Sequence, residues 1–179
     1  MKKKLIAFLQ RIINWIKKNK IKSAIAFLLL TTYYFSLPRT LFQEPYSTVI
    51  ESREGELLGA KIASDGQWRF PAQDSVPDKF KKCIVYFEDQ YFYKHPGFNP
   101  MAMINAIKQN NRAGKVVRGG STVTQQVIRL SRKGKGRTYF EKIIEIILAT
   151  RLELRDSKEE ILDLYAAHAP FGGNVVGLE

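Results

Sequence analysis

The segment Gly119-Gly-Ser-Thr-Val-Thr-Gln-Gln126 marks the beginning of a helix. Thr122 and Gln125 have the spacing of a capping box, in which the two side chains satisfy each other's free backbone N–H groups. Two further boxes precede apolar-periodic runs downstream, Thr138-x-x-Glu141 and Ser157-x-x-Glu160. These signals predict helices near residues 122–131, 139–154 and 158–167.

Two more helices are expected upstream of this segment. A first-turn proline and apolar residues at helical spacing predict one over 77–89, and Asn99-Pro100 opens another over 100–111. Before them, the β-leaning stretches 46–50 and 56–62 are separated by Ser-Arg-Glu-Gly, which predicts a short hairpin. The expected fold is mainly α, with a small N-terminal β-hairpin.

The N-terminus has the pattern of a membrane anchor. Residues 21–37 are apolar or weakly polar apart from Lys22 and a few hydroxyl residues, a length at the short end of a membrane span. No acid precedes this run, but eight basic residues lie within or before it: Lys2, Lys3, Lys4, Arg11, Lys17, Lys18, Lys20 and Lys22. The positive-inside rule then predicts a cytoplasmic N-terminus. A cleaved signal peptide is the alternative.

These patterns divide the chain into four parts. We expect a basic amphipathic segment at 1–20, a transmembrane signal-anchor at 21–38, a linker with the hairpin at 39–75, and a helical domain at 76–179. The last residues, from Phe171 to Glu179, stop in mid-pattern, so we expect the domain to be incomplete at its C-terminus.

Composition limits the chemistry. A single cysteine excludes an intramolecular disulfide, and two histidines make a histidine-built metal site improbable. Cys83 is interpreted as a small buried core residue on an apolar helical face. The net charge of +12 would suit a nucleic-acid binder, but much of it lies in the N-terminal cluster and no nucleic-acid motif is present.

Glu88 and Asp89 form the first candidate site. They end a predicted helix and run into a loop rich in aromatic residues, where a carboxylate that is partly desolvated suits general acid or base catalysis. A solvated helix end is the competing interpretation. His95, in the same loop, is interpreted as a turn residue.

A predicted anion site is the second candidate. No acidic residue lies between Asp89 and Glu141, and ten basic residues surround the helix start at Ser121 and Thr122. Free N–H groups, hydroxyls and cations together favour a phosphate or pyrophosphate group. Downstream, Glu141 has a capping role. Glu145 lies in the apolar run Ile-Ile-Glu-Ile-Ile, where a buried acid is unfavourable unless it has a partner or a function.

At these residues the sequence resembles glycosyltransferase family 51, the peptidoglycan glycosyltransferases. Two other stretches, Ala169-Pro-Phe-Gly-Gly173 and Asp65-Gly-Gln-Trp-Arg69, look most like the 1C type of class A penicillin-binding protein. Two motifs match closely: Glu88-Asp-x-x-Phe-x-x-His-x-Gly97 and Gly120-Ser-Thr-Val-Thr-Gln-Gln126. Two others depart from the family pattern, because Glu141 replaces an arginine and Ala167 replaces an asparagine.

The resemblance implies a lysozyme-like helical domain that polymerises lipid II with inversion and releases polyprenyl pyrophosphate. It implies Glu88 as the general base and Glu145 as the group that assists the leaving pyrophosphate, directly or through a divalent cation such as Mg²⁺ or Mn²⁺. The residues it implies for substrate binding are Asp89, Phe92, His95, Gly120, Ser121, Thr122, Gln125, Gln126, Lys142 and Lys158.

The expected partners are lipid II, the growing glycan strand, the membrane and other cell-wall synthesis proteins, with no nucleic acid. The expected location is the bacterial inner membrane, with the catalytic part in the periplasm. Two alternatives stay open. One is a lytic transglycosylase or muramidase, which would not need the basic pyrophosphate site. The other is an inactive membrane-anchored remnant, in view of Glu141 and Ala167.

Overall fold

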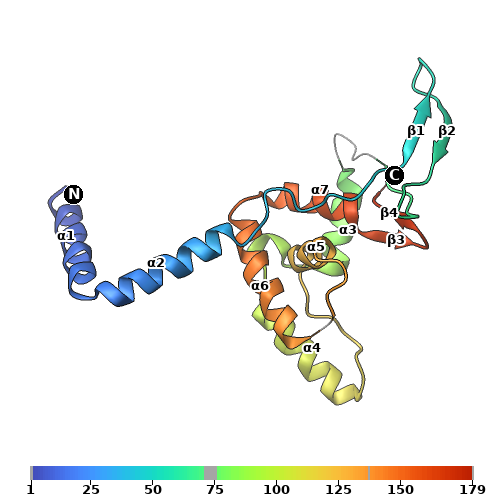
Figure 1. Cartoon of the computed structure of the whole chain (residues 1–179). Helices are drawn as coiled ribbons and strands as arrows, with labels where there is room; N and C mark the ends of the chain where they lie inside the picture. The colour runs from blue at the N-terminus through green and yellow to red at the C-terminus, as the bar shows by residue number, and fades with distance from the viewer. Residues whose placement is uncertain (1, 71–75, 137, 179) are drawn as a thin grey trace. The chain divides into compact units, whose positions relative to one another are not determined.

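The computed structural model describes residues 2–70, 76–136 and 138–178. The chain forms two compact units, Met1–Pro38 and Arg39–Glu179 (Figure 1). The first unit is a pair of helices and the second holds all the strands together with the remaining helices.

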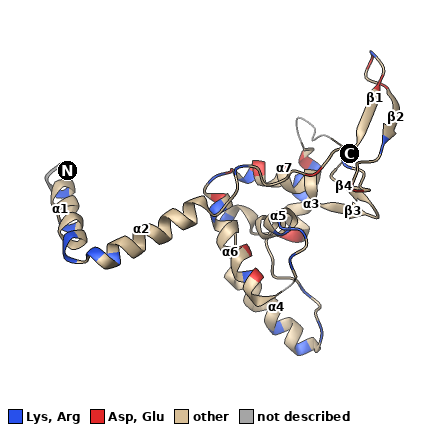
Figure 2. Ribbon diagram, in the orientation of Figure 1, with Lys and Arg blue, Asp and Glu red and all other residues tan. Residues whose placement is uncertain are grey.

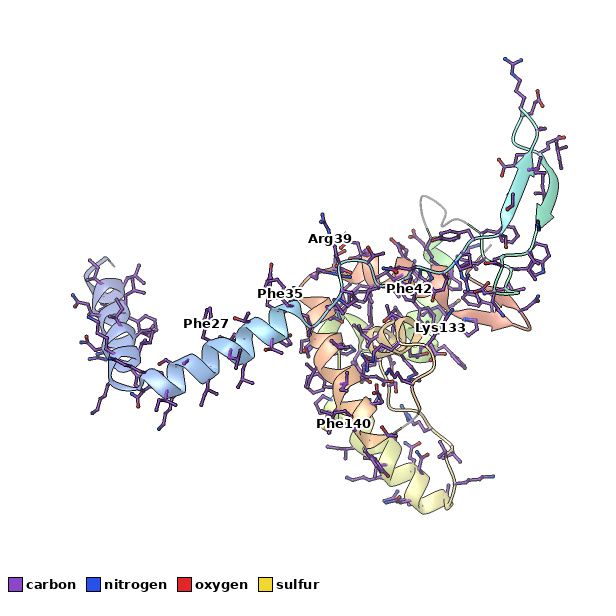
Figure 3. All side chains as sticks on the ribbon, viewed as in Figure 1. Phe27, Phe35, Arg39, Phe42, Lys133 and Phe140 are labelled. Carbon is purple, nitrogen blue, oxygen red and sulfur yellow. The ribbon has the colours of Figure 1, made fainter. Side chains whose placement is uncertain are left out.

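The first unit consists of α1 (Lys2–Lys18) and α2 (Lys20–Phe35). Basic residues lie at both ends of α1 and at the start of α2 (Figure 2). Large apolar side chains of both helices are exposed, among them Phe27 and Phe35, which extend from α2 into solvent (Figure 3).

The predicted transmembrane anchor is not supported. With 16 residues, α2 is shorter than the predicted span of 21–38, and at 1.5 Å per residue its length is about 24 Å. A bilayer's hydrocarbon core is about 30 Å thick. Within the described part of the chain, no helix combines the length and the apolar character needed to cross a membrane.

The second unit is mainly helical, as the sequence predicted. Its helices are α3 (Asp78–Glu88), α4 (Pro100–Ala113), α5 (Val123–Ser131), α6 (Tyr139–Glu153) and α7 (Lys158–His168), with a 3₁₀ turn, η1, at Phe92–Lys94. The predicted hairpin is present as β1 (Thr48–Glu51) antiparallel to β2 (Leu57–Lys61). A second hairpin, β3 (Pro170–Gly172) with β4 (Val175–Val176), was not predicted.

The capping boxes explain where the helices begin. Thr122 and Ser157 both form the complete reciprocal box expected for α5 and α7. At the start of α6 only half of the box forms: the Thr138 side chain accepts a hydrogen bond from the Glu141 N–H. The Glu141 carboxylate instead pairs with Arg132 at 2.8 Å, so this part of the prediction was wrong.

The core lies around α5, which packs against both α6 and α7 (Figure 1). Val127 and Ile128 of α5, Leu152 of α6 and Ile161 of α7 are fully buried. This packing holds the N-terminus of α5, with its Gly-Gly-Ser-Thr segment, in a fixed place relative to α6.

Two glycines allow the loops of the site to pack tightly. Gly97 has φ +90°, and a Cβ atom there would lie 2.6 Å from the carbonyl oxygen of Ala149 in α6. A Cβ atom on Gly120 would lie 2.9 Å from the Cα of Met103 in α4. Larger side chains at either position would push the loops away from these helices.

Cys83 is exposed, so the prediction of a buried core residue was wrong. Phe87, one helical turn further along α3, is also largely exposed. This face of α3 therefore points away from the described core, although its apolar spacing is typical of a buried face.

Candidate active site

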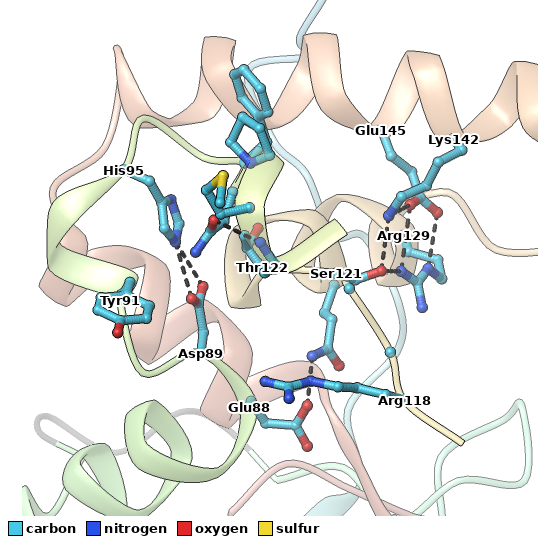
Figure 4. A pocket seen from close by; sticks show the side chains of 18 of the residues that line it. Glu88, Asp89, Tyr91, His95, Arg118, Ser121, Thr122, Arg129, Lys142 and Glu145 are labelled. Atoms are coloured by element: carbon cyan, nitrogen blue, oxygen red, sulfur yellow. Dashed lines mark hydrogen bonds and ion pairs between the residues drawn. The ribbon is translucent and has the colours of Figure 1, made fainter. Parts of the chain in front are cut away.

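A single cleft of about 1550 Å³ brings the two predicted sites together. Its walls come from the end of α3, the loop after it, the first turn of α4, the segment 117–122, and parts of α5 and α6. Figure 4 shows the pair Asp89 and His95 on one side of Thr122, and Glu145 with its basic partners on the other.

Glu88 lies at the C-terminal end of α3, half-buried in the cleft wall. Its Oε2 atom accepts a hydrogen bond from Nε2 of Gln126 at 2.8 Å, which fixes the carboxylate relative to α5. Burial, and to a smaller extent the charge of Glu88, raise the pKa of Tyr165. The hydrogen bond from Gln126 therefore orients Glu88, which lines the cleft.

Asp89 connects the loop to α5. Both carboxylate oxygens lie within hydrogen-bond distance of Nε2 of His95, at 2.9 and 3.1 Å. One of them also accepts the backbone N–H of Val123, in the first turn of α5, at 3.1 Å. The side chains of Asp89 and His95 are almost fully buried. Their geometry indicates a support for the loop that holds Glu88.

Lys158 supports the same loop from behind. Its Nζ atom donates to the carbonyl oxygen of His95 at 2.9 Å, pairs with Glu153 at 2.6 Å, and lies 4.4 Å from the ring centre of Phe92. Thr124 of α5 donates to the same glutamate at 2.6 Å. Neither Phe92 nor Lys158 lines the cleft, although both were predicted to bind substrate.

The predicted anion site is a compact cluster of charges. Nζ of Lys142 donates to Oγ of Ser121 at 2.8 Å and pairs with Glu145 at 3.1 Å. Arg129 donates to the same hydroxyl at 2.9 Å and pairs with Glu145 at 2.9 Å. The N-terminus of α5 and two cations therefore meet at Ser121.

Glu145 is buried, with 8% of its surface exposed. Burial acts to raise the pKa of its carboxyl group, but Arg129 and Lys142 outweigh burial and lower the pKa overall. Glu145 is therefore ionised at neutral pH. The charges of Arg129 and Lys142 stabilise this acid within an otherwise apolar run.

Thr122 and Gln125 occupy the helix start itself. Thr122 lines the cleft beside Gly120, but its hydroxyl donates to the carbonyl oxygen of Gly97 at 2.7 Å. Gln125 is fully buried and does not line the cleft; its Oε1 atom accepts a hydrogen bond from Lys142 at 2.9 Å. Both side chains are thus used in holding the site together.

Arg129 and Arg132 were counted among the ten basic residues of the predicted anion site without a role of their own, and Glu141 was given only a capping role. All three line the cleft. The signal for Arg129 was present, because it follows Gln125 and Gln126 by about one helical turn and so shares their side of α5. The pairing of Arg132 with Glu141 depends on how α5 and α6 meet, which the sequence does not reveal.

The donor set does not fit a divalent cation at Glu145. Both of its carboxylate oxygens are engaged by Arg129 and Lys142. Among the described residues, no three His, Cys, Asp or Glu side chains are grouped so that they could hold a metal ion.

Known proteins are similar in sequence to this chain. A family model described as Transglycosylase matches residues 55–179. Penicillin-binding protein 1C of Escherichia coli is 37% identical over 142 residues, which cover 79% of this chain and 18% of that protein. A biosynthetic peptidoglycan transglycosylase of Alcanivorax borkumensis is 39% identical over 106 residues, 59% of this chain and 43% of that protein.

A biosynthetic peptidoglycan transglycosylase of Ralstonia nicotianae is 31% identical over 153 residues, which cover 84% of this chain and 65% of that protein. The chain thus spans less than two thirds of the length of each of these relatives. The matched region includes every residue of the cleft described above. On the extent of that match and the identities to these relatives, the chain belongs to the transglycosylase family.

Proposed function

We propose that this chain is a peptidoglycan glycosyltransferase that polymerises lipid II, inverts the anomeric carbon and releases polyprenyl pyrophosphate. The observation that carries the proposal is the cleft, in which a carboxylate on one wall faces an anion-binding cluster on another. The family membership supports the same reaction and a lysozyme-like arrangement of the helices.

Glu88 would act as the general base. The 4-hydroxyl of the acceptor sugar attacks the anomeric carbon of the donor, and its proton passes to Glu88 as the bond from that carbon to the pyrophosphate oxygen breaks. The hydrogen bond from Gln126 uses one carboxylate oxygen and leaves the other available for the hydroxyl. Asp89 and His95 would hold the loop in place without contacting the reacting atoms.

Arg129, Lys142 and the Ser121 hydroxyl would bind the leaving pyrophosphate. Glu145 is ionised in this cluster, because its pKa is lowered despite the opposing effect of burial. It is therefore a poor proton donor at neutral pH, and we assign it the role of orienting Arg129 and Lys142. Hydrogen bonds between these cations and phosphate oxygens are among the stronger ones in proteins.

The N-terminal unit would keep the enzyme at the membrane that holds its lipid-linked substrate. Its exposed apolar side chains and its basic residues without acids suit contact with an anionic membrane. The catalytic unit would work at the outer face of the bacterial inner membrane, where other cell-wall synthesis proteins would be its neighbours.

The test is the conversion of lipid II by the purified full chain in detergent. We expect glycan strands and free polyprenyl pyrophosphate as products, and no cleavage of existing glycan strands. Cleavage of strands without polymerisation would instead identify a lytic transglycosylase. Absence of both reactions in a folded protein would identify an inactive remnant and overturn the proposal.

A further inference from the structure

Two ion pairs join α5 and its end to α6 in successive steps. Arg129 pairs with Glu145 at 2.9 Å, and Arg132 pairs with Glu141 at 2.8 Å. Arg132 follows Arg129 by three residues, and Glu141 precedes Glu145 by four residues, so the two pairs lie about one helical turn apart. All four side chains line the cleft, so the second pair extends the anion-binding wall.

Glu141 pairs with Arg132 instead of completing the capping box of its own helix. Its carboxylate would complete the capping box of α6 by accepting the N–H of Thr138, but that N–H donates to the carbonyl oxygen of Gly136 at 3.0 Å. The carboxylate instead accepts a hydrogen bond from Nη2 of Arg132. The side chain of Arg132 is therefore held in the cleft wall rather than extended into solvent.

Arg132 still has donors to offer. A guanidinium group carries five N–H bonds, and the Glu141 carboxylate accepts one of them at 2.8 Å. Nε of Arg132 is buried, so a ligand in the cleft could be reached only by the N–H bonds of the two Nη atoms. The side chain is 28% exposed, so part of it remains accessible from the cleft.

The net charge of the first cluster is smaller than the charge of a pyrophosphate group. Arg129, Lys142 and Glu145 together carry a net charge of +1, and Arg132 with Glu141 carries none. A pyrophosphate ester carries at least two negative charges on two phosphate groups. The first cluster alone therefore neutralises only part of the ligand.

We propose that Arg132 is a second pyrophosphate-binding residue, held in position by Glu141, and that it contacts the phosphate group that Arg129 and Lys142 do not. This assignment rests on the proposed function, because it names a further residue for the same leaving group. It also explains why an acid lies in this wall: the Glu141 carboxylate would repel a pyrophosphate group, but it positions Arg132.

Two neutral substitutions in the same ion pair separate this role from a structural one. The probes are farnesyl diphosphate, farnesyl monophosphate and farnesol, titrated into the full chain in detergent micelles. Arg132→Gln removes donors to the second phosphate, so the diphosphate should bind about 10- to 100-fold more weakly, while the monophosphate changes little. Glu141→Gln keeps an acceptor for Arg132 but removes the competing charge, so diphosphate binding should stay equal or become tighter.

A structural ion pair would give equal effects from the two substitutions, and that result overturns the assignment. Parent-like diphosphate binding by folded Arg132→Gln also overturns it. If either variant does not fold, the double variant Arg132→Gln/Glu141→Gln replaces it, and it must lose the preference for diphosphate over monophosphate.

Lys142→Ala distinguishes failure of this inference from failure of the proposed function. If Lys142→Ala weakens both phosphate ligands while Arg132→Gln changes neither, the pyrophosphate site stands and only the role of Arg132 is wrong. If the parent protein binds farnesyl diphosphate no better than farnesol, the proposed function and the role of Arg132 both fail.

Discussion

Among single residues, Glu88 carries the sharpest prediction. Glu88→Gln keeps the shape of the side chain and a hydrogen-bond partner for Gln126, but it removes the basic carboxylate. Loss of a general base should lower the rate of lipid II polymerisation by about 10²–10⁴-fold. The midpoint of thermal unfolding should stay close to that of the parent protein.

Asp89→Asn is the matched control for Glu88→Gln. Asp89 is buried and contacts both His95 and the Val123 N–H, so the amide should disturb the loop and lower the thermal midpoint. Asp89→Asn should therefore lose stability and a smaller part of the activity, whereas Glu88→Gln should lose activity with little loss of stability. Polymerisation at the parent rate by Glu88→Gln would exclude Glu88 as the base and make Glu145 the next candidate.

Lys142→Ala tests the anion cluster at the same scale. Lys142 contacts Ser121, Gln125 and Glu145, and its removal should weaken binding of a lipid pyrophosphate by about 1.5–3 kcal/mol. Binding of a neutral disaccharide should change much less, which calorimetric titration of both ligands would measure. Equal weakening of the two ligands would mean that the lysine does not recognise phosphate.

At the scale of the helices, Lys158 of α7 supports the loop between α3 and α4. Lys158 is mostly buried between Glu153, the carbonyl oxygen of His95 and the ring of Phe92. Lys158→Met leaves the largely buried side chain of Glu153 with Thr124 as its remaining hydrogen-bond partner among the described residues, and such a change typically costs about 3–5 kcal/mol of folding free energy. Denaturant unfolding of the full chain measures this loss.

The double variant Lys158→Met/Glu153→Met is the control for the ion pair between Lys158 and Glu153. Removing both charges leaves no unpaired buried ion, so it should be more stable than Lys158→Met alone. If the double variant is less stable than the single one by the full cost of a second independent change, the two side chains do not act as a pair.

The helices themselves were predictable from the sequence, because their signals are local. Capping residues such as Thr122 and Ser157, together with apolar spacing, placed the helix ends within two residues of those observed. What failed depended on how different helices pack against one another. The pairing of Glu141 with Arg132 and the exposed position of Cys83 follow from how the helices pack, and spacing alone cannot determine that.

The candidate site was predictable for a similar reason, but only in part. Glu88, Ser121, Lys142 and Glu145 all line one cleft, so the motifs identified residues that the fold brings together. Phe92, Gln125 and Lys158 belong to the same motifs yet lie behind the cleft wall. A sequence motif does not separate a side chain that faces a ligand from one that supports it.

At the scale of the whole molecule, the division at Pro38 leads to a prediction about location. The first unit carries exposed apolar residues and a cluster of basic ones, whereas the cleft belongs to the second. Deleting residues 1–38 should move the protein from the membrane fraction into the soluble fraction, as fractionation of expressing cells would show. A truncated chain that stays with membranes would place the membrane contact in the second unit.

Acid should destabilise the second unit through His168, which lies at the end of α7 with its ring stacked on Phe42 at 3.6 Å. Burial, with smaller contributions from Arg69 and Lys133, lowers the pKa of His168 from 6.5 to about 4, against the opposing effect of Glu44. Between these two values the unfolded chain binds more protons than the folded one, so the free energy of unfolding falls as pH decreases.

The size of this effect can be measured in a narrow window. Between pH 7 and pH 5 the loss should reach about 1–2 kcal/mol, after allowance for the partial exposure of the ring. Denaturant unfolding of the full chain at several pH values gives the slope. His168→Phe keeps an aromatic ring against Phe42 but cannot bind a proton, so its slope in this window should be much smaller. An unchanged slope in His168→Phe would assign the acid sensitivity to other groups.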